Sequence, residues 1–160
     1  MREVTVLHVG NIKDRFFADA LAEYEKRLSA YCDLHSIEIK EEKTPAVPSD
    51  GQIALAITRE GERILSKLPE RAYKIALCIE GKELSSEKFS RLLSDAENAG
   101  HSRIVFIIGG SWGLSDTVKA ACDFRLSFSP MTFPHRLMRV LLAEQLYRAY
   151  TIRAGTGYHK

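Results

Sequence analysis

The segment from Arg125 to Lys160 combines basic side chains that can contact an anion with two histidines that can accept a proton. It contains six of the 23 Lys and Arg residues and one of the 21 Asp and Glu residues, which is Glu144. The segment therefore carries a formal charge of +5 and the remainder −3, which together give the net charge of +2. Two of the five histidines, His135 and His159, also lie here. A nearly neutral chain thus has a strongly basic C-terminal region.

Arginines near the start of the expected last helix favour contact with phosphate groups. Arg136 and Arg139 are three residues apart and follow His135, with no carboxylate nearby in the sequence. They can be solvated surface charges, but with Arg153 and Lys160 they form a candidate patch for an RNA backbone. We therefore expect RNA binding that weakens steeply as the salt concentration rises.

The last three residues combine an aromatic ring, an imidazole and an ammonium group. By position alone they belong to a frayed tail. The alternative is that Tyr158 stacks on a base while His159 and Lys160 make proton or phosphate contacts. Upstream, Glu144 and Arg148 are four residues apart on the expected helix, which allows either a structural ion pair or a functional role.

A glycine-rich turn, GGSWGL at residues 109–114, follows an apolar run. Its spacing differs from the GxGxxG pattern of dinucleotide-binding turns, and the chain has no GxxxxGK phosphate loop. The pattern GxSxG around Ser111 does fit a nucleophile elbow, which leaves a hydrolase as an alternative, although no HGGG-like oxyanion segment is present. Its acid would be Asp116 or Asp123 and its base His135 or His159. In the simplest interpretation, the glycines only permit a tight turn.

The elements that must position these residues alternate between strands and helices. We expect helices that begin at Ser49 or Asp50, at Ser85 or Ser86, and at Ser115, because these residues can act as N-caps. Apolar runs predict strands at residues 4–9, 34–39, 73–79, 103–108 and 124–128, and helical spacing predicts the longer helices at 12–31, 53–68, 86–99 and 132–150. This order predicts an α/β fold with a mainly parallel sheet and helices on both faces.

Composition restricts the class of protein. With 160 residues, 45% of them hydrophobic, the chain is most simply one domain spanning residues 1–160. Cys32, Cys78 and Cys122 lack CxxC spacing, so we expect reduced thiols and neither a disulfide framework nor a metal site. No signal-peptide core or membrane-spanning run is apparent, so we expect a cytoplasmic protein without a membrane partner.

The last expected helix is apolar around nearly its whole circumference. A helix of this kind must be covered on all sides, and one sheet face covers only one stripe. A symmetric homodimer is therefore expected, with deeper burial inside a monomer as the alternative. The apolar residues are Leu137, Met138, Val140, Leu141, Leu142, Leu146, Tyr147 and Ala149.

Three stretches, FIIGGSWGL, LSFSPMTFPHRLMRVLLAEQLYRA and the terminal YHK, resemble the SPOUT superfamily of RNA methyltransferases. Within it, the chain is similar over its full length to the ribosomal RNA large subunit methyltransferase H type. The resemblance implies S-adenosylmethionine as methyl donor, a homodimer, and methylation of N3 of a pseudouridine in 23S rRNA of the assembled ribosome. It also implies a C-terminal trefoil knot, which topology rules alone would not predict.

The resemblance also implies roles for individual residues. His159 is the first candidate for helping the N3 proton to leave, with Glu144 second, and no metal or nucleophile is needed. RNA contacts are expected from His135, Arg136, Arg139, Arg153, Tyr158 and Lys160. The implied cofactor pocket is formed by Leu77, Gly109, Phe128, Ser129, Pro130, Met131, Thr132 and Phe133.

Overall fold

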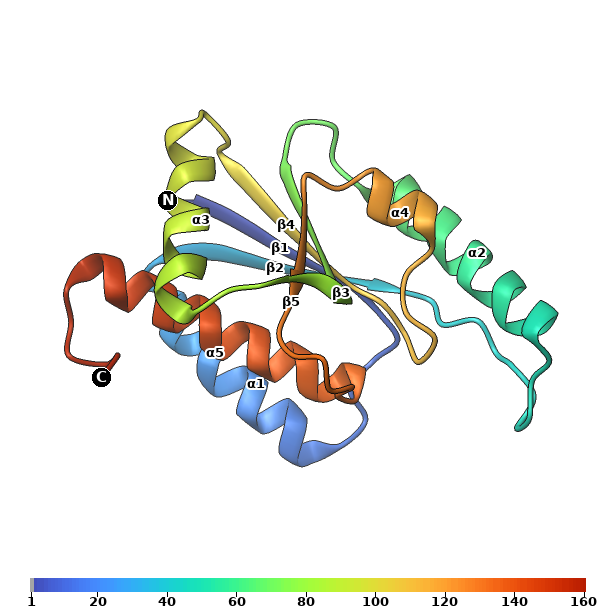
Figure 1. Ribbon diagram of the computed structural model, residues 1–160. Helices are drawn as coiled ribbons and strands as arrows, with labels where there is room; N and C mark the ends of the chain where they lie inside the picture. Colours follow the sequence, from blue (N-terminus) through green and yellow to red (C-terminus); the bar gives the residue numbers. More distant parts are fainter. Residues whose placement is uncertain (1) are drawn as a thin grey trace.

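The computed structural model describes residues 2–160 and contains a five-stranded parallel sheet with strand order β2-β1-β4-β3-β5 (Figure 1). The predicted α/β class with a parallel sheet is therefore confirmed. Its elements in chain order are β1 (Arg2–Val9), α1 (Arg15–Leu28), β2 (Cys32–Ile39), α2 (Asp50–Lys67), β3 (Tyr73–Glu83), α3 (Ser86–Asn98), β4 (Arg103–Ile108), α4 (Asp116–Ala120), β5 (Phe124–Ser127) and α5 (His135–Ala154).

Helices cover both faces of the sheet, as the alternating pattern predicts. Helices α1, α3 and α5 lie on one face, and α2 and α4 lie on the other (Figure 1). Each face has its own apolar core, one including Leu28, Phe89 and Leu146 and the other Ile64 and Val118. The central strand β4 is buried from Ile104 to Ile108, which explains its continuous apolar sequence.

Three serine N-caps fix where helices begin. Ser49 accepts the backbone N–H of Gln52, whose side chain accepts the N–H of Ser49 in return, forming a capping box at α2. Ser85 and Ser115 accept backbone N–H groups at the starts of α3 and α4. These cap predictions are confirmed, because a side-chain oxygen satisfies an N–H group that the first helical turn leaves unpaired.

Several predicted boundaries are wrong, most clearly those of β3 and α5. Strand β3 continues through Gly81 to Glu83, because it pairs there with β5. The two strands are so close that a Cβ at Gly81 would lie 2.8 Å from the backbone of Arg125. Helix α5 begins at His135, with Pro134 as its N-cap, and runs to Ala154 rather than Tyr150. Gly155, at a φ of 69°, ends the helix in the left-handed conformation that favours glycine.

Helix α5 buries only part of its apolar surface within one chain. Leu142, Ala143, Leu146, Ala149 and Tyr150 are buried against the sheet and the neighbouring helices. The apolar residues Leu137, Met138, Val140 and Leu141, near the start of the helix, stay partly exposed. An apolar surface therefore remains on α5 for which the single chain provides no complete cover.

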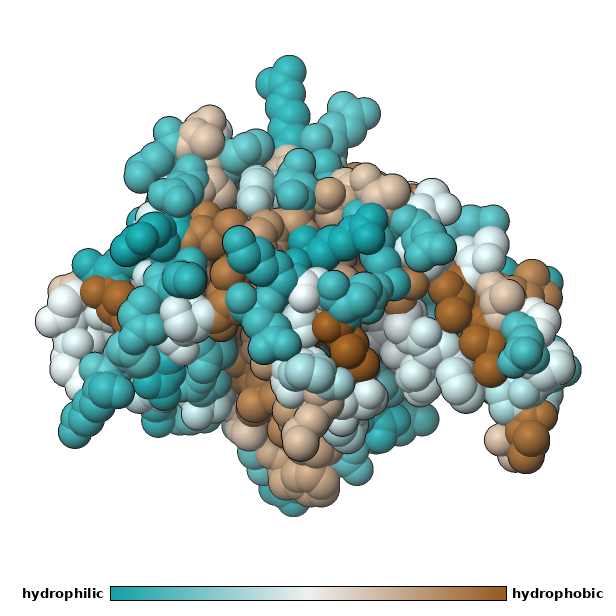
Figure 2. All heavy atoms as spheres, in the orientation of Figure 1, coloured by the Kyte–Doolittle hydropathy of each residue, from teal (hydrophilic) through white to brown (hydrophobic). Residues whose placement is uncertain are grey.

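The outer surface is largely polar. Figure 2 shows hydrophilic side chains over most of the visible face, interrupted by apolar groups, some at the bottom of the view near the start of α1. There Phe16 is 66% exposed. Within residues 2–160, no helix combines the length and apolarity required to cross a bilayer.

Candidate functional site

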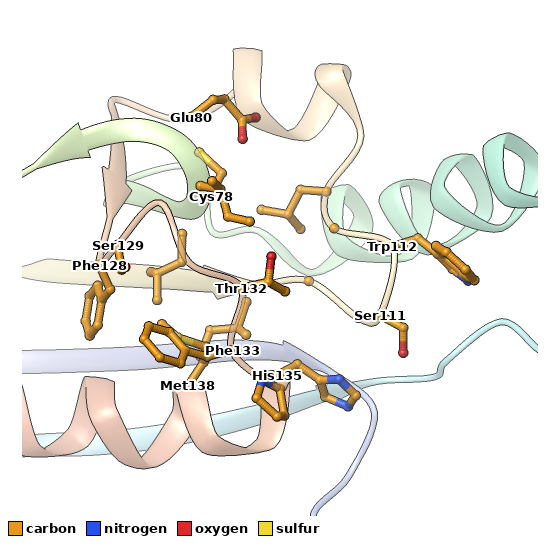
Figure 3. A pocket seen from close by; sticks show the side chains of 18 of the residues that line it. Cys78, Glu80, Ser111, Trp112, Phe128, Ser129, Thr132, Phe133, His135 and Met138 are labelled. Carbon is orange, nitrogen blue, oxygen red and sulfur yellow. The ribbon is translucent and has the colours of Figure 1, made fainter.

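A cavity of about 950 Å³ opens where β3, β4 and β5 end (Figure 3). Three chain segments supply most of its wall: residues 77–80, 108–114 and 126–136. Glu41, just after β2, Lys119 of α4 and Met138 of α5 complete the lining. Ligands in open α/β folds bind beyond the carboxyl ends of strands, and this cavity has that position.

Seven of the eight residues predicted for a cofactor pocket line this cavity. They are Leu77, Gly109, Phe128, Ser129, Met131, Thr132 and Phe133, whereas Pro130 is not part of the lining. Ile79, Ile108, Leu114, Leu126 and Met138 also contribute apolar wall, although sequence reasoning had not assigned them to the pocket. The available signal was their position, because Ile79 and Ile108 end strand-like apolar runs and Met138 follows the predicted pocket segment.

The glycine turn depends on close backbone packing. A Cβ on Gly109 would lie 2.8 Å from the carbonyl carbon and oxygen of Gly113, so no side chain fits there. The N–H of Gly113 donates to the carbonyl of Gly110 at 3.1 Å, and Gly113 has a φ of 84°. The turn is therefore tight, and its backbone forms part of the cavity wall.

The hydrolase alternative lacks its catalytic geometry. Within residues 2–160, Ser111 makes no hydrogen bond to a histidine. Asp123 instead accepts the backbone N–H of Lys74 at 2.8 Å, which ties it to β3. The glycines of GxSxG therefore serve the turn, and Ser111 is not part of a nucleophile–base pair.

The polar side chains on the cavity wall differ in how they are paired. Lys119 pairs with Glu80, and this hydrogen bond lowers the pKa of the Glu80 carboxyl. Arg136 pairs with Asp14 at 3.2 Å, a carboxylate 122 residues away in the sequence. Glu41 makes no ion pair or side-chain hydrogen bond within residues 2–160.

His135 stands at the start of α5, on the cavity wall. Burial lowers its pKa and the nearby guanidinium groups of Arg136 and Arg139 act in the same direction, whereas the carboxylate of Glu41 acts to raise it. Its Nε2 atom is buried and has no hydrogen-bond partner among the residues that the structure describes. Arg139 itself is 9% exposed, and burial lowers its pKa as well. His135 is therefore neutral near pH 7, and Arg139 is poorly placed to reach RNA from outside.

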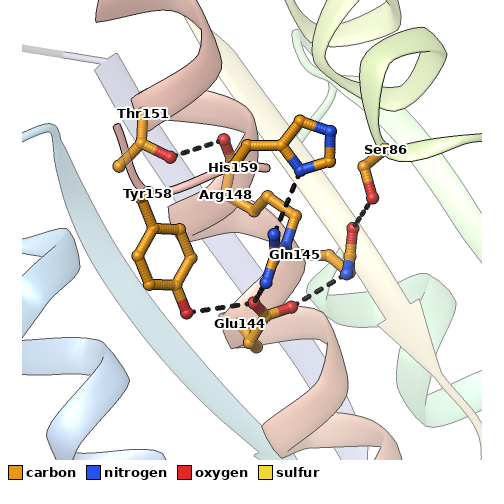
Figure 4. A network of polar contacts seen from close by, with 7 residues as sticks. All are labelled: Ser86, Glu144, Gln145, Arg148, Thr151, Tyr158 and His159. Atoms are coloured by element: carbon orange, nitrogen blue, oxygen red, sulfur yellow. Dashed lines mark hydrogen bonds and ion pairs between the residues drawn. The ribbon is translucent and has the colours of Figure 1, made fainter. Parts of the chain in front are cut away.

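The two residues predicted to assist proton removal belong to one hydrogen-bond network, which joins the middle of α5 to the C-terminal tail (Figure 4). Arg148 donates to Oε1 of Glu144 from Nε at 3.0 Å and from Nη2 at 2.6 Å. The same oxygen accepts the hydroxyl of Tyr158 at 3.2 Å. The tail is therefore folded back against α5 instead of frayed.

Both ring nitrogens of His159 are engaged in this network. Nδ1 lies 3.0 Å from Nη1 of Arg148, and Nε2 lies 2.7 Å from Oε1 of Glu87. A guanidinium has only donors, so Nδ1 accepts, and Nε2 carries the proton donated to Glu87. The Nδ1 lone pair can accept another proton only after Arg148 releases it.

The network and the cavity occupy different regions of one chain. Neither Glu144 nor His159 lines the cavity, whereas His135 does. Thirteen residues separate His135 from Arg148, which is about 20 Å along a helix at 1.5 Å per residue. Within a single chain, the predicted cofactor residues and the predicted proton acceptors are therefore not brought together.

The residues predicted to contact RNA fall into two groups. His135, Arg136 and Arg139 lie at the start of α5, and Arg153, Tyr158 and Lys160 lie at its end or beyond it. Arg153 pairs with the buried carboxylate of Glu97 at 2.6 Å, while Lys160 is exposed. One chain thus offers no continuous patch of these six residues, and their contacts with RNA remain predictions.

Comparison with protein families gives one match that spans almost the whole chain. Residues 2–159 match the family model described as predicted SPOUT methyltransferase. A chain of similar fold is a probable methylase family protein from Haemophilus influenzae, with a TM-score of 0.55 and 11% identity. That likeness covers 98% of this chain and 70% of the other, and it supports the fold alone.

Several curated relatives are much closer in sequence. The ribosomal RNA large subunit methyltransferase H of Bifidobacterium adolescentis is 49% identical over 158 residues, which cover 99% of both chains. The protein of the same name from Clostridioides difficile is 47% identical over 157 residues, covering 98% of this chain and 99% of the relative. That of Streptococcus agalactiae is 46% identical over 158 residues, with 99% of each chain covered.

Proposed function

The chain belongs to the SPOUT methyltransferase family, and we propose that it methylates N3 of a pseudouridine in 23S rRNA of the assembled ribosome, with S-adenosylmethionine as donor. The observation that carries this proposal is the cavity beside the glycine turn, lined by seven of the eight residues expected to hold the donor. The relatives named as large-subunit rRNA methyltransferases support the choice of RNA. A ribosomal substrate would place the enzyme in the cytoplasm.

The residues around the cavity fit this donor. Its volume lies within the range of small-molecule sites, roughly 300–1,000 Å³. Leu77, Phe128 and Phe133 offer apolar walls to an adenosine, and the absence of a side chain at Gly109 lets the turn pack closely. When bound, S-adenosylmethionine supplies a methyl group already activated by a sulfonium. The protein therefore chiefly aligns donor and acceptor and excludes water.

The N3 proton of the target base must leave, and His159 remains our first candidate to accept it, with Glu144 second. Along α5, Glu144 lies about 14 Å from the start of the helix, and Arg148, which contacts His159, lies about 20 Å from it. We therefore propose that a second subunit brings these two residues to the cavity. A two-fold pairing of antiparallel α5 helices would cover the partly exposed residues Leu137 and Leu141. The same pairing would place one subunit's tail beside the other subunit's cavity.

This arrangement would also join the two groups of predicted RNA contacts. His135 and Arg136 of one subunit would then lie near Tyr158 and Lys160 of the other, so that phosphate and base contacts surround one cavity. Light scattering at micromolar concentration should give twice the chain mass of 18.0 kDa. A mass near 18.0 kDa would exclude the dimer.

The proposed activity is tested with labelled S-adenosylmethionine and ribosomes from a strain lacking the enzyme. We expect label in 23S rRNA, with the variant Ser111→Ala as active as the unmodified protein because Ser111 has no catalytic partner. In single-turnover reactions, His159→Ala should slow transfer while leaving donor binding intact. Full methylation by this variant would exclude His159, and ribosomes that stay unlabelled by the unmodified enzyme would refute the proposed function.

A further inference from the structure

Glu41 differs from the other acidic residues at the cavity. It lines the cavity just after β2, and its Oε2 atom would lie 3.4 Å from a Cβ placed on Gly10. Nε2 of His135 would lie at the same distance from that Cβ, so the carboxylate and the imidazole flank Gly10. Within residues 2–160, no cation lies within ion-pair distance of Glu41. A negative charge is therefore present at the cavity without an internal partner.

The neighbouring residue explains how this carboxylate is held in place. The side chain of Glu42 pairs with Arg59 at 3.0 Å and with Arg63 at 2.6 Å, which anchors the segment to α2. The backbone N–H of Glu42 donates to Oε2 of Glu60 at 2.9 Å. The side chain of Glu42 is thus held by its ion pairs with α2, while the adjacent side chain of Glu41 lies on the cavity wall.

Glu60 connects this segment to the glycine turn. It is only 4% exposed, and burial raises the pKa of its carboxyl. Its Oε1 atom would lie 3.4 Å from a Cβ on Gly110, so the carboxyl group rests against the turn. One buried side chain therefore fixes the distance between Glu41 and the turn that borders the cavity.

The charges around Glu41 leave its negative charge uncompensated. Glu41 acts to raise the pKa of His135, but burial outweighs this effect and lowers that pKa, and Arg136 is paired with Asp14. Glu80, the other carboxylate on the cavity wall, is neutralised by Lys119. A ligand that carries a positive charge toward Glu41 would supply the missing partner.

We infer that Glu41 recognises the positively charged ammonium group at the amino-acid end of the methyl donor, an inference that rests on the proposed function. The apolar wall around Leu77 and Phe133 suits the adenosine, whereas Glu41 is an exposed residue at the polar rim. The zwitterionic amino-acid end is the part of the donor that gains most from a polar, charged rim. Glu41 therefore distinguishes ligands that have this end from those that lack it.

The test compares three ligands by calorimetry on Glu41→Gln and the unmodified protein. S-adenosylmethionine and S-adenosylhomocysteine both carry the ammonium group, whereas 5′-methylthioadenosine lacks the amino-acid end. An exposed charge-assisted hydrogen bond predicts roughly threefold to tenfold weaker binding of the first two ligands to the variant. Binding of 5′-methylthioadenosine, measured by competition if it is weak, should not change.

The control is Glu62→Gln, which removes an exposed carboxylate from α2 outside the cavity lining and should leave all three affinities unchanged. If Glu41→Gln binds every ligand as tightly as the unmodified protein does, the inference is overturned. Equal weakening of all three would also overturn it, because it would mean a disturbed cavity. Loss confined to S-adenosylmethionine would place Glu41 at the sulfonium instead and reject the assignment. If the unmodified protein binds neither charged ligand, the proposed function itself fails.

Discussion

Replacing Gly109 by alanine should damage the cavity through a defined steric clash. Gly109 does not have a positive φ, so a side chain there is limited by space and not by backbone conformation. The new Cβ would lie 2.8 Å from two backbone atoms of Gly113 and 3.1 Å from Cδ2 of Leu114, whereas ordinary contact begins at 3.4 Å. Backbone atoms cannot rotate away, so the turn must shift. Overpacking of this kind costs about 1–3 kcal/mol in free energy of unfolding.

Urea denaturation and calorimetry with S-adenosylmethionine measure both consequences of Gly109→Ala. We expect a lower free energy of unfolding. Donor binding should also weaken, by about tenfold if the displaced cavity wall costs roughly 1.4 kcal/mol of binding free energy. Gly51→Ala is the matched control, because its Cβ would meet only Ser49 Oγ, at 4.0 Å. In the first turn of α2, that change should be neutral or stabilise by up to about 1 kcal/mol. Unchanged stability and affinity in Gly109→Ala would refute the steric reasoning.

Three further predictions follow from buried or paired groups. Burial lowers the pKa of His8 below 6.5, so the unfolded chain takes up this proton first as the pH falls. The free energy of unfolding should therefore fall as the pH drops below about 6.5, by up to about 1.4 kcal/mol per pH unit for this group. In urea titrations at several pH values, His8→Asn should make the free energy of unfolding depend less on pH. An unchanged slope would contradict this. Burial raises the pKa of Cys32 and Cys122 to about 11, so at pH 8 a disulfide reagent should label both slowly in the folded protein and quickly in urea. Fast labelling of the folded protein, located by mass spectrometry, would show that these thiols are not protected. Arg148→Met should lower the free energy of unfolding by about 1–3 kcal/mol, because it breaks two hydrogen bonds to a partly buried carboxylate. Arg15→Met, which breaks only an exposed 3.9 Å pair, should change it by less than about 0.5 kcal/mol, and equal effects in urea denaturation would contradict the assignment.

The order of elements could be predicted because it depends on local signals. Apolar runs marked the buried strands, and serine caps marked the starts of α2, α3 and α4. The end of α5 was predicted too early, although Gly155 was a usable signal for a left-handed C-cap. The predicted strand at residues 73–79 stops short of Gly81, whereas β3 continues through this glycine, which the close approach of β5 requires. That approach joins segments distant in the chain, and no local pattern reveals it.

The wall of the cavity was largely predictable, but its charges were not. The segment from Phe128 to Phe133 and the glycine turn were assigned to the pocket from resemblance, and they do line one cavity. Arg136 lacks a carboxylate nearby in the sequence, yet Asp14 pairs with it across 122 residues. In the same way, Arg153 pairs with Glu97, 56 residues away. Such pairs are set by the packing of α1 and α3 against α5, which periodicity does not encode.

The tail shows a further limit of prediction from sequence. Position alone suggests fraying, but the ring of Tyr158 packs against that of Tyr147, with centroids 4.7 Å apart. The guanidinium of Arg148 lies over the Tyr158 ring. These contacts hold His159 away from the cavity of its own chain. The role of His159 therefore remains a prediction, and so do the dimer and the trefoil knot.

The most direct test of the proposed function is to locate the transferred methyl group. Ribosomes from a strain lacking the enzyme would be incubated with the purified protein and labelled S-adenosylmethionine. Nucleotides from the 23S rRNA would then be mapped by mass spectrometry. We predict label at N3 of one pseudouridine, absent when the donor is omitted. Label on another atom of the RNA would contradict the assigned specificity, and label on ribosomal protein or nowhere would contradict the function itself.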